Sequence, residues 1–211
     1  IRHCSLRQMT DILLIRHGEN DYTKKGKLAG WLPGVHLNET GLAQANAVAE
    51  RLAKAPVKAI YSSPLERALE TASPLAQAKK LSIHKRDGVG EVRYGDWTGK
   101  SLKGLARTKL WEVVQRQPSA MEFPDGETFR AVQARAVEAV QRIANDHPKD
   151  LVAVVSHGDV IKLILAYYLG TPLDLFQRIL VGTGSISAIR LTRGGPLVIR
   201  VNEQVEALWA K

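Results

Sequence analysis

The stretch Ile12-Leu13-Leu14-Ile15-Arg16-His17-Gly18 governs how the rest of this sequence is interpreted. Its first four residues are branched and apolar, which predicts a short strand buried on both faces, as in a parallel sheet. The strand then stops at a cation, an imidazole and a glycine. Ligands bind beyond the carboxyl ends of the strands in open α/β sheets. We therefore expect Arg16 and His17 to lie at the rim of a binding site.

Two further apolar runs end in a similar way. Residues 57–61 lead into Ser62-Ser63-Pro64, where a hydroxyl and a proline predict the start of a helix with Arg67 in its first turn. Residues 151–155 form the most apolar run and lead into Ser156-His157-Gly158. Because the carboxyl ends of parallel strands meet at one edge of a sheet, two histidines and two arginines are expected at the same rim.

The other segments alternate between helix and strand patterns. Helices are expected over about residues 38–54, 64–79, 101–115, 128–145 and 160–169, and strands over 82–86, 185–191 and 197–201. Leu42 is expected on the apolar face of the first helix. Residues 19–38 are expected to form a long loop, and residues 87–100, with four glycines, an irregular segment of the kind that carries function. This order predicts the α/β class, with a mostly parallel sheet and an antiparallel hairpin near the C-terminal end.

The composition restricts the classes of function. The 211 residues allow one domain with a substantial core, and the single cysteine, Cys4, excludes an internal disulfide and a cysteine-based zinc knuckle. No apolar run approaches the ~18 residues of a membrane span, so no membrane partner is expected. Lys and Arg total 30 against 21 Asp and Glu, and the net charge of +9 fits an anionic partner such as nucleic acid, acidic lipid or a phosphorylated small molecule.

The N-terminal residues carry two expectations. Residues 1–8 lack the apolar core of a signal peptide, so a cytoplasmic location is expected. Met9 directly precedes the first strand, which suggests that it is the natural start. Residues 1–8 would then be an N-terminal extension, either disordered or added from outside the natural sequence, and residues 9–211 would form a single domain.

Two arginines and two histidines at one rim suit a phosphate group. Guanidinium groups match phosphate oxygens, and the helix expected after His157 would add backbone N–H groups that favour an anion. A neutral imidazole in such a site can attack phosphorus through one nitrogen, while the other nitrogen donates a hydrogen bond that fixes the tautomer. The second histidine, when protonated, would stabilise charge on the phosphoryl group.

A leaving alkoxide also needs a general acid. Glu91, in the glycine-punctuated segment, is the candidate, provided that burial or the bound phosphate raises its pKa. Asp159 follows the second histidine closely. It is expected to cap the helix that begins there rather than to line the pocket, because short acidic residues are common at helix starts.

The motifs around these residues resemble those of a known family. In order along the chain they are Leu14-Ile15-Arg16-His17-Gly18-Glu19, Gly30-Trp31, Leu37-Asn38-Glu39-Thr40-Gly41, Tyr61-Ser62-Ser63-Pro64-Leu65-Glu66-Arg67-Ala68, Gly90-Glu91-Val92-Arg93-Tyr94-Gly95-Asp96-Trp97-Thr98-Gly99 and Val155-Ser156-His157-Gly158. These ordered matches over roughly residues 11–192 resemble the histidine phosphatase superfamily, in its phosphoglycerate mutase-like branch. The resemblance implies a three-layer α/β/α sandwich with a mostly parallel central sheet, and no metal or organic cofactor.

The resemblance also implies roles for individual residues. The nucleophile that forms a phosphohistidine would be His17, the phosphate pocket would be Arg16, Arg67 and His157, and the proton donor and later base for water would be Glu91. Further substrate contacts are expected from Thr23, Gly158, Arg93, Tyr94 and Lys100. Thr23 falls where mutases of the family often have an asparagine. The expected partner is a small-molecule phosphomonoester, and the family suggests a homodimer.

Within the family, the sequence favours a phosphatase. Mutases typically carry a longer insertion after the segment of Glu91, with adjacent arginines, whereas residues 101–124 are compact and contain no such pair. The stretch Gly95-Asp96-Trp97-Thr98-Gly99 looks like the phosphatase branch, including its broad-specificity members. We therefore expect hydrolysis of a phosphomonoester, with a phosphoglycerate mutase as the runner-up.

Other classes of protein have weaker support. Residues 95–101 miss a P-loop because only three residues separate the glycines. A basic nucleic-acid-binding module would account for the charge of +9, but aromatic residues make up only 6% and no binding motif is present, so no nucleic acid partner is expected. The six histidines contain no i, i+4 pair, which argues against a zinc site.

Overall fold

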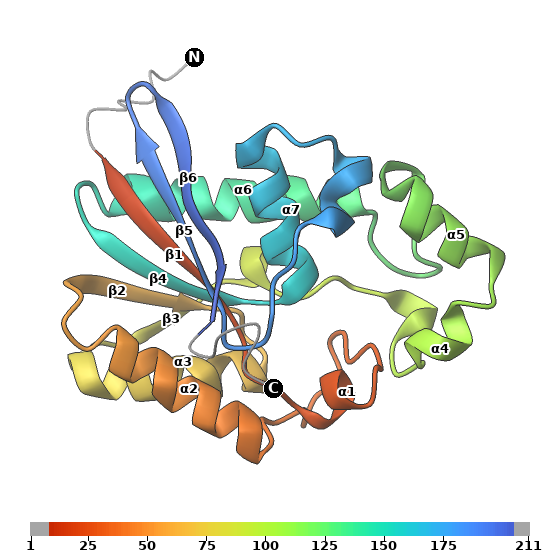
Figure 1. The fold of residues 1–211 in the computed structure, drawn as a ribbon, viewed down its shortest axis with the longest axis horizontal. Helices are drawn as coiled ribbons and strands as arrows, with labels where there is room; N and C mark the ends of the chain where they lie inside the picture. The colour runs from red at the N-terminus through yellow and green to blue at the C-terminus, as the bar shows by residue number, and fades with distance from the viewer. Residues whose placement is uncertain (1–8, 205–211) are drawn as a thin grey trace.

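A six-stranded sheet with the order β3-β2-β4-β1-β5-β6 forms the centre of the computed structural model, which describes residues 9–204 (Figure 1). The strands are β1 (Thr10–Arg16), β2 (Val57–Ser62), β3 (Ile83–Lys85), β4 (Leu151–Ser156), β5 (Ile186–Thr192) and β6 (Gly195–Glu203). The first four run parallel, whereas β5 pairs antiparallel with β1 and β6 antiparallel with β5. The predicted α/β class, mostly parallel sheet and terminal hairpin are therefore confirmed. The extension predicted for residues 1–8 lies outside the described residues.

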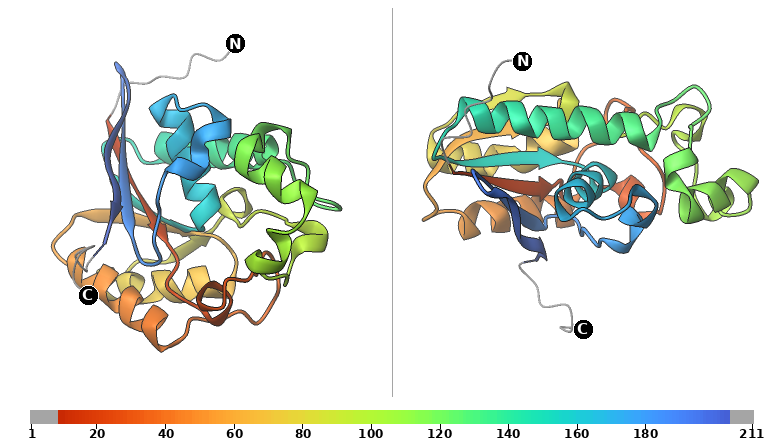
Figure 2. Two further views of the ribbon diagram at one scale, coloured as in Figure 1. Left: turned by 45° about the vertical axis from the view of Figure 1, so that its right-hand side comes forward. Right: turned by 90° about the horizontal axis from the view of Figure 1, so that it is seen from above.

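Helices cover both faces of the sheet (Figures 1 and 2). One face carries α2 (Glu39–Arg51) and α3 (Glu66–Lys79), and the other carries α6 (Phe129–Asp146) and α7 (Gly158–Leu169). The side chains of β1 alternate between the two cores. Ile12 and Leu14 join the core under α6 and α7, and Leu13 and Ile15 join the core under α2 and α3. Each fully buried apolar side chain stabilises the fold by about 1.5–3 kcal/mol, which explains the unbroken apolar run.

Short helices lie beyond the carboxyl ends of β1 and β4 (Figure 2). They are α1 (Asp21–Lys24), α4 (Leu102–Leu105) and α5 (Lys109–Arg116). The connecting segments include the 3-10 turns η1 (Asp87–Val89), η2 (Gly95–Trp97), η3 (Pro118–Ala120) and η4 (Leu173–Arg178). None of the helices within residues 9–204 combines the length and the apolar character that crossing a bilayer requires.

Two predictions about loops and helices are wrong. The loop predicted over residues 19–38 contains α1, because the Asn20 side chain accepts hydrogen bonds from the first backbone N–H groups of that helix. The single helix predicted over residues 101–115 is two helices. Ser101 caps α4, and a turn at residues 106–108 separates it from α5.

The start of α3 and the buried face of α2 also differ from prediction. α3 begins at Glu66, and its N-cap residue, Leu65, provides no side-chain cap. The Ser63 hydroxyl accepts from the backbone N–H of Leu65 at 3.4 Å and is also hydrogen-bonded to Nε2 of His157 at 2.7 Å, so this serine joins the helix start to the rim of the sheet. Leu42 of α2 is 50% exposed and does not belong to the buried face.

We expect Leu14→Ala to lower the free energy of unfolding by about 2–5 kcal/mol, because Leu14 is fully buried and its truncation leaves a cavity. Leu42→Ala is the matched control and should cost about 0.5 kcal/mol or less, because Leu42 is half exposed. Urea denaturation of both variants checks the expectation. Equal losses would contradict the placement of Leu42.

Candidate active site

The residues of the candidate site follow the carboxyl ends of three neighbouring strands. β4 lies between β1 and β2, so the carboxyl ends of these strands are adjacent. His17 follows β1 and His157 follows β4, directly after the paired residues Arg16 and Ser156. Arg67 comes from the first turn of α3, the helix that follows β2. The structure therefore brings together the two arginines and the two histidines that the sequence pattern placed at one rim.

His17 is held as a neutral imidazole. Its side chain is buried, and Nδ1 donates a hydrogen bond of 2.7 Å to the carbonyl oxygen of Gly18, which fixes the tautomer. Burial, together with the nearby guanidinium groups of Arg67 and Arg16, holds the pKa of His17 well below its usual range. The Nε2 lone pair is therefore available at neutral pH, as a nucleophile requires.

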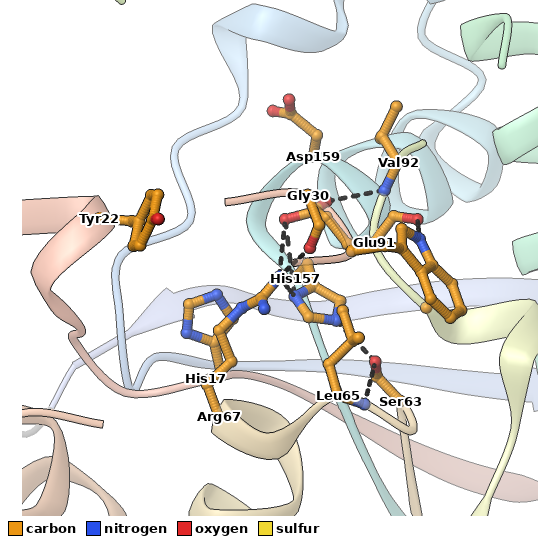
Figure 3. A network of polar contacts seen from close by, with 12 residues as sticks. His17, Tyr22, Gly30, Ser63, Leu65, Arg67, Glu91, Val92, His157 and Asp159 are labelled. Atoms are coloured by element: carbon orange, nitrogen blue, oxygen red, sulfur yellow. Dashed lines mark hydrogen bonds and ion pairs between the residues drawn. The ribbon is translucent and has the colours of Figure 1, made fainter. Parts of the chain in front are cut away.

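His157 lies beside His17, with the ring centroids 5.1 Å apart (Figure 3). Nη2 of Arg67 donates to Nδ1 of His157 at 3.2 Å, and Nε2 lies 2.7 Å from Oγ of Ser63. Because a guanidinium can only donate, Nδ1 is the acceptor and Nε2 carries the ring proton. Burial and then the charge of Arg67 hold the pKa of His157 well below its usual range, so this ring is also neutral before an anion binds.

Glu91 approaches the same groups from the segment between η1 and η2 (Figure 3). Its Oε2 lies 3.5 Å from Nδ1 of His157 and 3.8 Å from Nη2 of Arg67. Its Oε1 accepts a hydrogen bond of 3.0 Å from the backbone N–H of Val92. Burial raises the pKa of Glu91 to about 7, outweighing the opposite effect of Arg67. A carboxyl group with this pKa can give and take a proton near neutral pH.

Both arginines have buried donor atoms without a protein acceptor. Nη1 of Arg16 donates to the carbonyl oxygen of Val181 at 2.7 Å, and Nη2 of Arg67 donates to that of Gly30 at 2.9 Å. Nε of Arg16, and Nε and Nη1 of Arg67, have no hydrogen-bond partner among residues 9–204. An unpaired buried donor costs about 1–3 kcal/mol, and more on a charged group. The arrangement therefore fits an anion with several oxygens, such as phosphate.

A cavity of about 280 Å³ lies over these groups. Its wall also contains the aromatic side chains of Trp97, Trp111, Phe123 and Phe129 and the polar side chains of Lys27, Lys162 and Gln177. The cavity thus combines the two guanidinium groups with both apolar and polar surface. A bound molecule can place a phosphate against the arginines and contact this surface with the rest of its structure.

The first residue of α7, Gly158, lies directly against the side chain of Arg16. A Cβ atom at position 158 would lie 3.1 Å from Nε of Arg16, closer than side chains normally approach. The absence of a side chain therefore lets the guanidinium lie at the start of the helix. Backbone N–H groups and the positive end of the helix dipole favour an anion at the same place.

Thr23 and Tyr94 line the cavity, but both hydroxyl groups are engaged. Oγ1 of Thr23 donates to the backbone oxygen of Asn20 at 2.8 Å. The Tyr94 hydroxyl donates to Oδ2 of Asp159 at 3.0 Å, and Nζ of Lys162 donates to Oδ1 of Asp159 at 3.3 Å. Because these two side chains occupy its oxygens, Asp159 lines the cavity and does not cap α7, contrary to the prediction.

Arg93 and Lys100 lie outside the cavity wall. The guanidinium carbon of Arg93 lies 4.0 Å from the centroid of the Trp31 ring, in a cation–π contact. The Lys100 side chain is exposed, and the backbone of this residue is bonded to Leu28 and Trp97. Neither residue is among those that line the cavity, and their contact with the substrate stays a prediction.

Arg135 of α6 holds the segment of Glu91, a role that the sequence pattern does not reveal. Its Nη1 donates to the carbonyl oxygens of Gly88 and Gly90, and its Nη2 to that of Glu91, each at 2.9 Å. Its Nε donates to Glu127 at 2.8 Å. An arginine on an amphipathic helix resembles an ordinary surface residue in the sequence. In the folded chain its donors satisfy backbone groups of a segment that has no strand partner.

The site also meets a geometric condition for binding a metal ion. His17, Glu91 and His157 each offer one ligand atom, and these atoms lie within 4.8 Å of one another. Histidine spacing in the sequence could not indicate this cluster, because its members come from three separate segments. The guanidinium groups beside it oppose a cation, and Nδ1 of His157 already accepts from Arg67. The residues present therefore fit an oxyanion better than a metal ion.

Comparisons with known proteins agree with one another. The sequence profile of the histidine phosphatase superfamily (branch 1) matches residues 12–204. The phosphoserine phosphatase 1 of Hydrogenobacter thermophilus is 29% identical over 197 residues, which are 92% of either chain. A metal-independent phosphoserine phosphatase of Arabidopsis thaliana is 36% identical over 172 residues, which cover 74% of this chain and 68% of that protein.

The fold is similar to that of a solved phosphatase. A mutant phosphoserine phosphatase of Entamoeba histolytica, in complex with phosphoserine, matches with a TM-score of 0.83 and 25% sequence identity. The match covers 92% of this chain and 96% of that one. The profile match over residues 12–204 includes every segment that contributes a residue to the site.

We expect Gly158→Ala to weaken the binding of inorganic phosphate about tenfold, or ~1.4 kcal/mol, because the new methyl group displaces the Arg16 guanidinium. Isothermal titration calorimetry measures the dissociation constant. Gly194→Ala is the matched control, because a Cβ atom there would meet only the Thr192 hydroxyl at 3.7 Å, in the β5–β6 turn. Parent-like phosphate binding by Gly158→Ala would contradict the expectation.

Proposed function

This chain belongs to the histidine phosphatase superfamily (branch 1) and is a phosphatase of that type, and we propose that it hydrolyses small-molecule phosphomonoesters through a phosphohistidine at His17. One observation carries the proposal. A buried, neutral imidazole shares a cavity with two guanidinium groups, each with at least one donor that has no acceptor among residues 9–204, and with a carboxyl group whose pKa is about 7. These are the nucleophile, the anion site and the acid–base group that phosphoryl transfer without a metal ion needs.

In the first step, Nε2 of His17 attacks the phosphorus atom of the bound ester. The N–P bond forms while the P–O bond to the alcohol breaks, and the protonated Glu91 gives its proton to the departing oxygen. Arg16 and Arg67 donate to the phosphoryl oxygens as negative charge moves onto the leaving group. The two negative charges of the bound phosphate ester also favour protonation of His157, which would then donate to the phosphoryl oxygens.

In the second step, water replaces the alcohol. The Glu91 carboxylate, now without its proton, takes one from water as the water oxygen attacks phosphorus. The O–P bond forms and the N–P bond breaks. The electron pair of the N–P bond returns to Nε2 of His17, and inorganic phosphate leaves. Both histidine and carboxyl groups are then in their starting states, so the cycle balances without a cofactor.

The size of the cavity supports a small metabolite as the substrate. A volume of about 280 Å³ accommodates a phosphate and a modest organic group, and it is enclosed in part by aromatic side chains. Relatives named phosphoserine phosphatases make phosphoserine the first compound to test. The name of the Arabidopsis thaliana relative also supports a reaction that needs no metal ion.

We expect the parent protein to release phosphate from p-nitrophenyl phosphate and from phosphoserine in excess EDTA, and His17→Ala to lose at least about 10³-fold of this activity, because it lacks the nucleophile. An assay of released inorganic phosphate gives the hydrolysis rates of both proteins. Quenching with alkaline detergent during turnover of a ³²P-labelled ester should trap an alkali-stable, acid-labile label on the parent only. Retained activity in His17→Ala would refute the assignment.

The same experiment separates hydrolysis from the mutase alternative. Incubation with 3-phosphoglycerate, followed by analysis of the product isomers, shows whether the phosphoryl group moves to water or to another hydroxyl. Isomer interconversion with little free phosphate would favour a phosphoglycerate mutase. Release of phosphate without isomerisation would favour the phosphatase.

We expect kcat/KM for an alkyl phosphate to fall as the pH rises above about 7, because the raised pKa of Glu91 means that its acid form is lost there. The nucleophile does not limit this range, since the pKa of His17 lies well below its usual value. Glu91→Gln should lower the rate by about 10²–10⁴-fold and abolish this pH dependence. A steady-state pH profile of both proteins checks this. The same alkaline decline in Glu91→Gln would exclude Glu91 as its source.

A further inference from the structure

We propose that the side-chain amide of Asn20 is a ligand of the phosphoryl group, in the place that the family resemblance assigned to Thr23. The proposal rests on the proposed function in that the anion is taken to be the phosphate of the substrate. Asn20 lies in the loop after β1 and lines the same cavity as Arg16, His17 and Arg67.

The amide of Asn20 is fixed in one orientation. Its Oδ1 accepts hydrogen bonds from the backbone N–H groups of Tyr22 at 2.9 Å and Thr23 at 3.0 Å. Exchanging the oxygen and nitrogen of the amide would set N–H groups against N–H groups and lose both bonds. Nδ2 is therefore the other end of the group, and it has two hydrogens to donate.

Those two hydrogens have no acceptor. Asn20 is fully buried, and Nδ2 has no hydrogen-bond partner among residues 9–204. The unpaired nitrogens of Arg16 and Arg67 line the same cavity, so three side chains there present donors without acceptors. Buried donors are rarely left in this state without a ligand. A phosphoryl group supplies three oxygens, enough to satisfy all three side chains at once.

Thr23 lines the cavity, but its hydroxyl hydrogen is already used in a hydrogen bond within the chain. Its Oγ1 donates to the backbone oxygen of Asn20 at 2.8 Å and accepts from the backbone N–H of Asn20 at 3.0 Å. Together with the bonds to Oδ1, these contacts form a closed capping box at the start of α1. Thr23 is thus a positioning residue that holds the backbone and the amide oxygen of Asn20, while the amide nitrogen remains for the ligand.

Two substitutions separate the donor from the cap. Asn20→Ser keeps a strong N-cap oxygen but removes the amide. Asn20→Asp keeps the cap oxygen and replaces Nδ2 by a second oxygen, which repels an anion. We expect inorganic phosphate, titrated by calorimetry at pH 7, to bind about tenfold more weakly to Asn20→Ser and about a hundredfold more weakly to Asn20→Asp, with melting temperatures close to the parent value.

The matched control is Asn38→Ser. Asn38 caps α2 by accepting from the backbone N–H of Gly41, in the same manner as Asn20 caps α1, but it does not line the cavity. Phosphate affinity of this variant should equal that of the parent. For each Asn20 variant, kcat/KM should fall by the same factor with p-nitrophenyl phosphate as with phosphoserine. A ligand of the phosphoryl group acts on both substrates, whatever the leaving group is.

A measurement on the parent protein avoids any dependence on the stability of the variants. In a ¹⁵N–¹H spectrum, the side-chain amide protons of Asn20 should shift as phosphate is added, and saturate with the calorimetric dissociation constant. Unchanged phosphate affinity in both variants, or an Asn20 amide signal that ignores phosphate, would overturn the proposal. Weakened phosphate binding in a protein that hydrolyses no phosphomonoester would support the Asn20 ligand while refuting the proposed hydrolysis.

Discussion

The two buried guanidinium groups of Arg16 and Arg67 set the conditions for the rest of the site. Their charge, added to burial, keeps the imidazoles of His17 and His157 neutral at neutral pH. A neutral ring has the free lone pair that a nucleophile needs. The same charges hold the pKa of Glu91 at about 7 instead of at the higher value that burial alone would produce. Without the cations, the histidines would be protonated more easily and the carboxyl group would rarely lose its proton.

The fold brings together these donors, several of which have no partner within residues 9–204. Arg16 stands at the end of β1, a strand whose neighbouring side chains anchor it in two separate cores. Arg67 belongs to the first turn of α3 and is tied to the carbonyl oxygen of Gly30. The strand order, with β4 in the middle, then sets both arginines around the same cavity. An anion that supplies acceptors to these donors stabilises the site, because a buried donor without an acceptor is costly in free energy.

The acid–base group is positioned in a different manner. Glu91 lies in an irregular segment, so no strand pairing fixes its backbone. Arg135 and the indole N–H of Trp31 both donate to the carbonyl oxygen of Glu91, at 2.9 and 2.7 Å. Arg93 in turn stacks on Trp31. Two pairs of arginines therefore have different roles. Arg16 and Arg67 line the cavity, whereas Arg135 and Arg93 support the segment that bears the Glu91 carboxyl group.

The sequence by itself determined the order of the elements, the parallel sheet and the four charged or polar residues of the rim. Apolar runs and the residues that end them are local patterns, and Arg16, His17, Arg67 and His157 each stand next to one. The glycine-rich segment around Glu91 is typical of a functional loop, and the family resemblance implies the acid–base role of its carboxyl group.

Tertiary structure alone decided which polar side chains have a partner. The hydroxyl of Ser63 bonds to His157 as well as to the backbone N–H of Leu65, and Asp159 accepts from Tyr94 instead of capping α7. Arg93 stacks on Trp31, and the amide nitrogen of Asn20 has no hydrogen-bond partner in the described part of the chain. Hydrogen bonds depend on distances between segments that are far apart in the chain, and those distances exist only after the sheet has assembled. That is why neighbouring residues in the sequence indicate Arg16, His17, Arg67 and His157, whereas only the folded chain shows how the Asn20 amide is oriented.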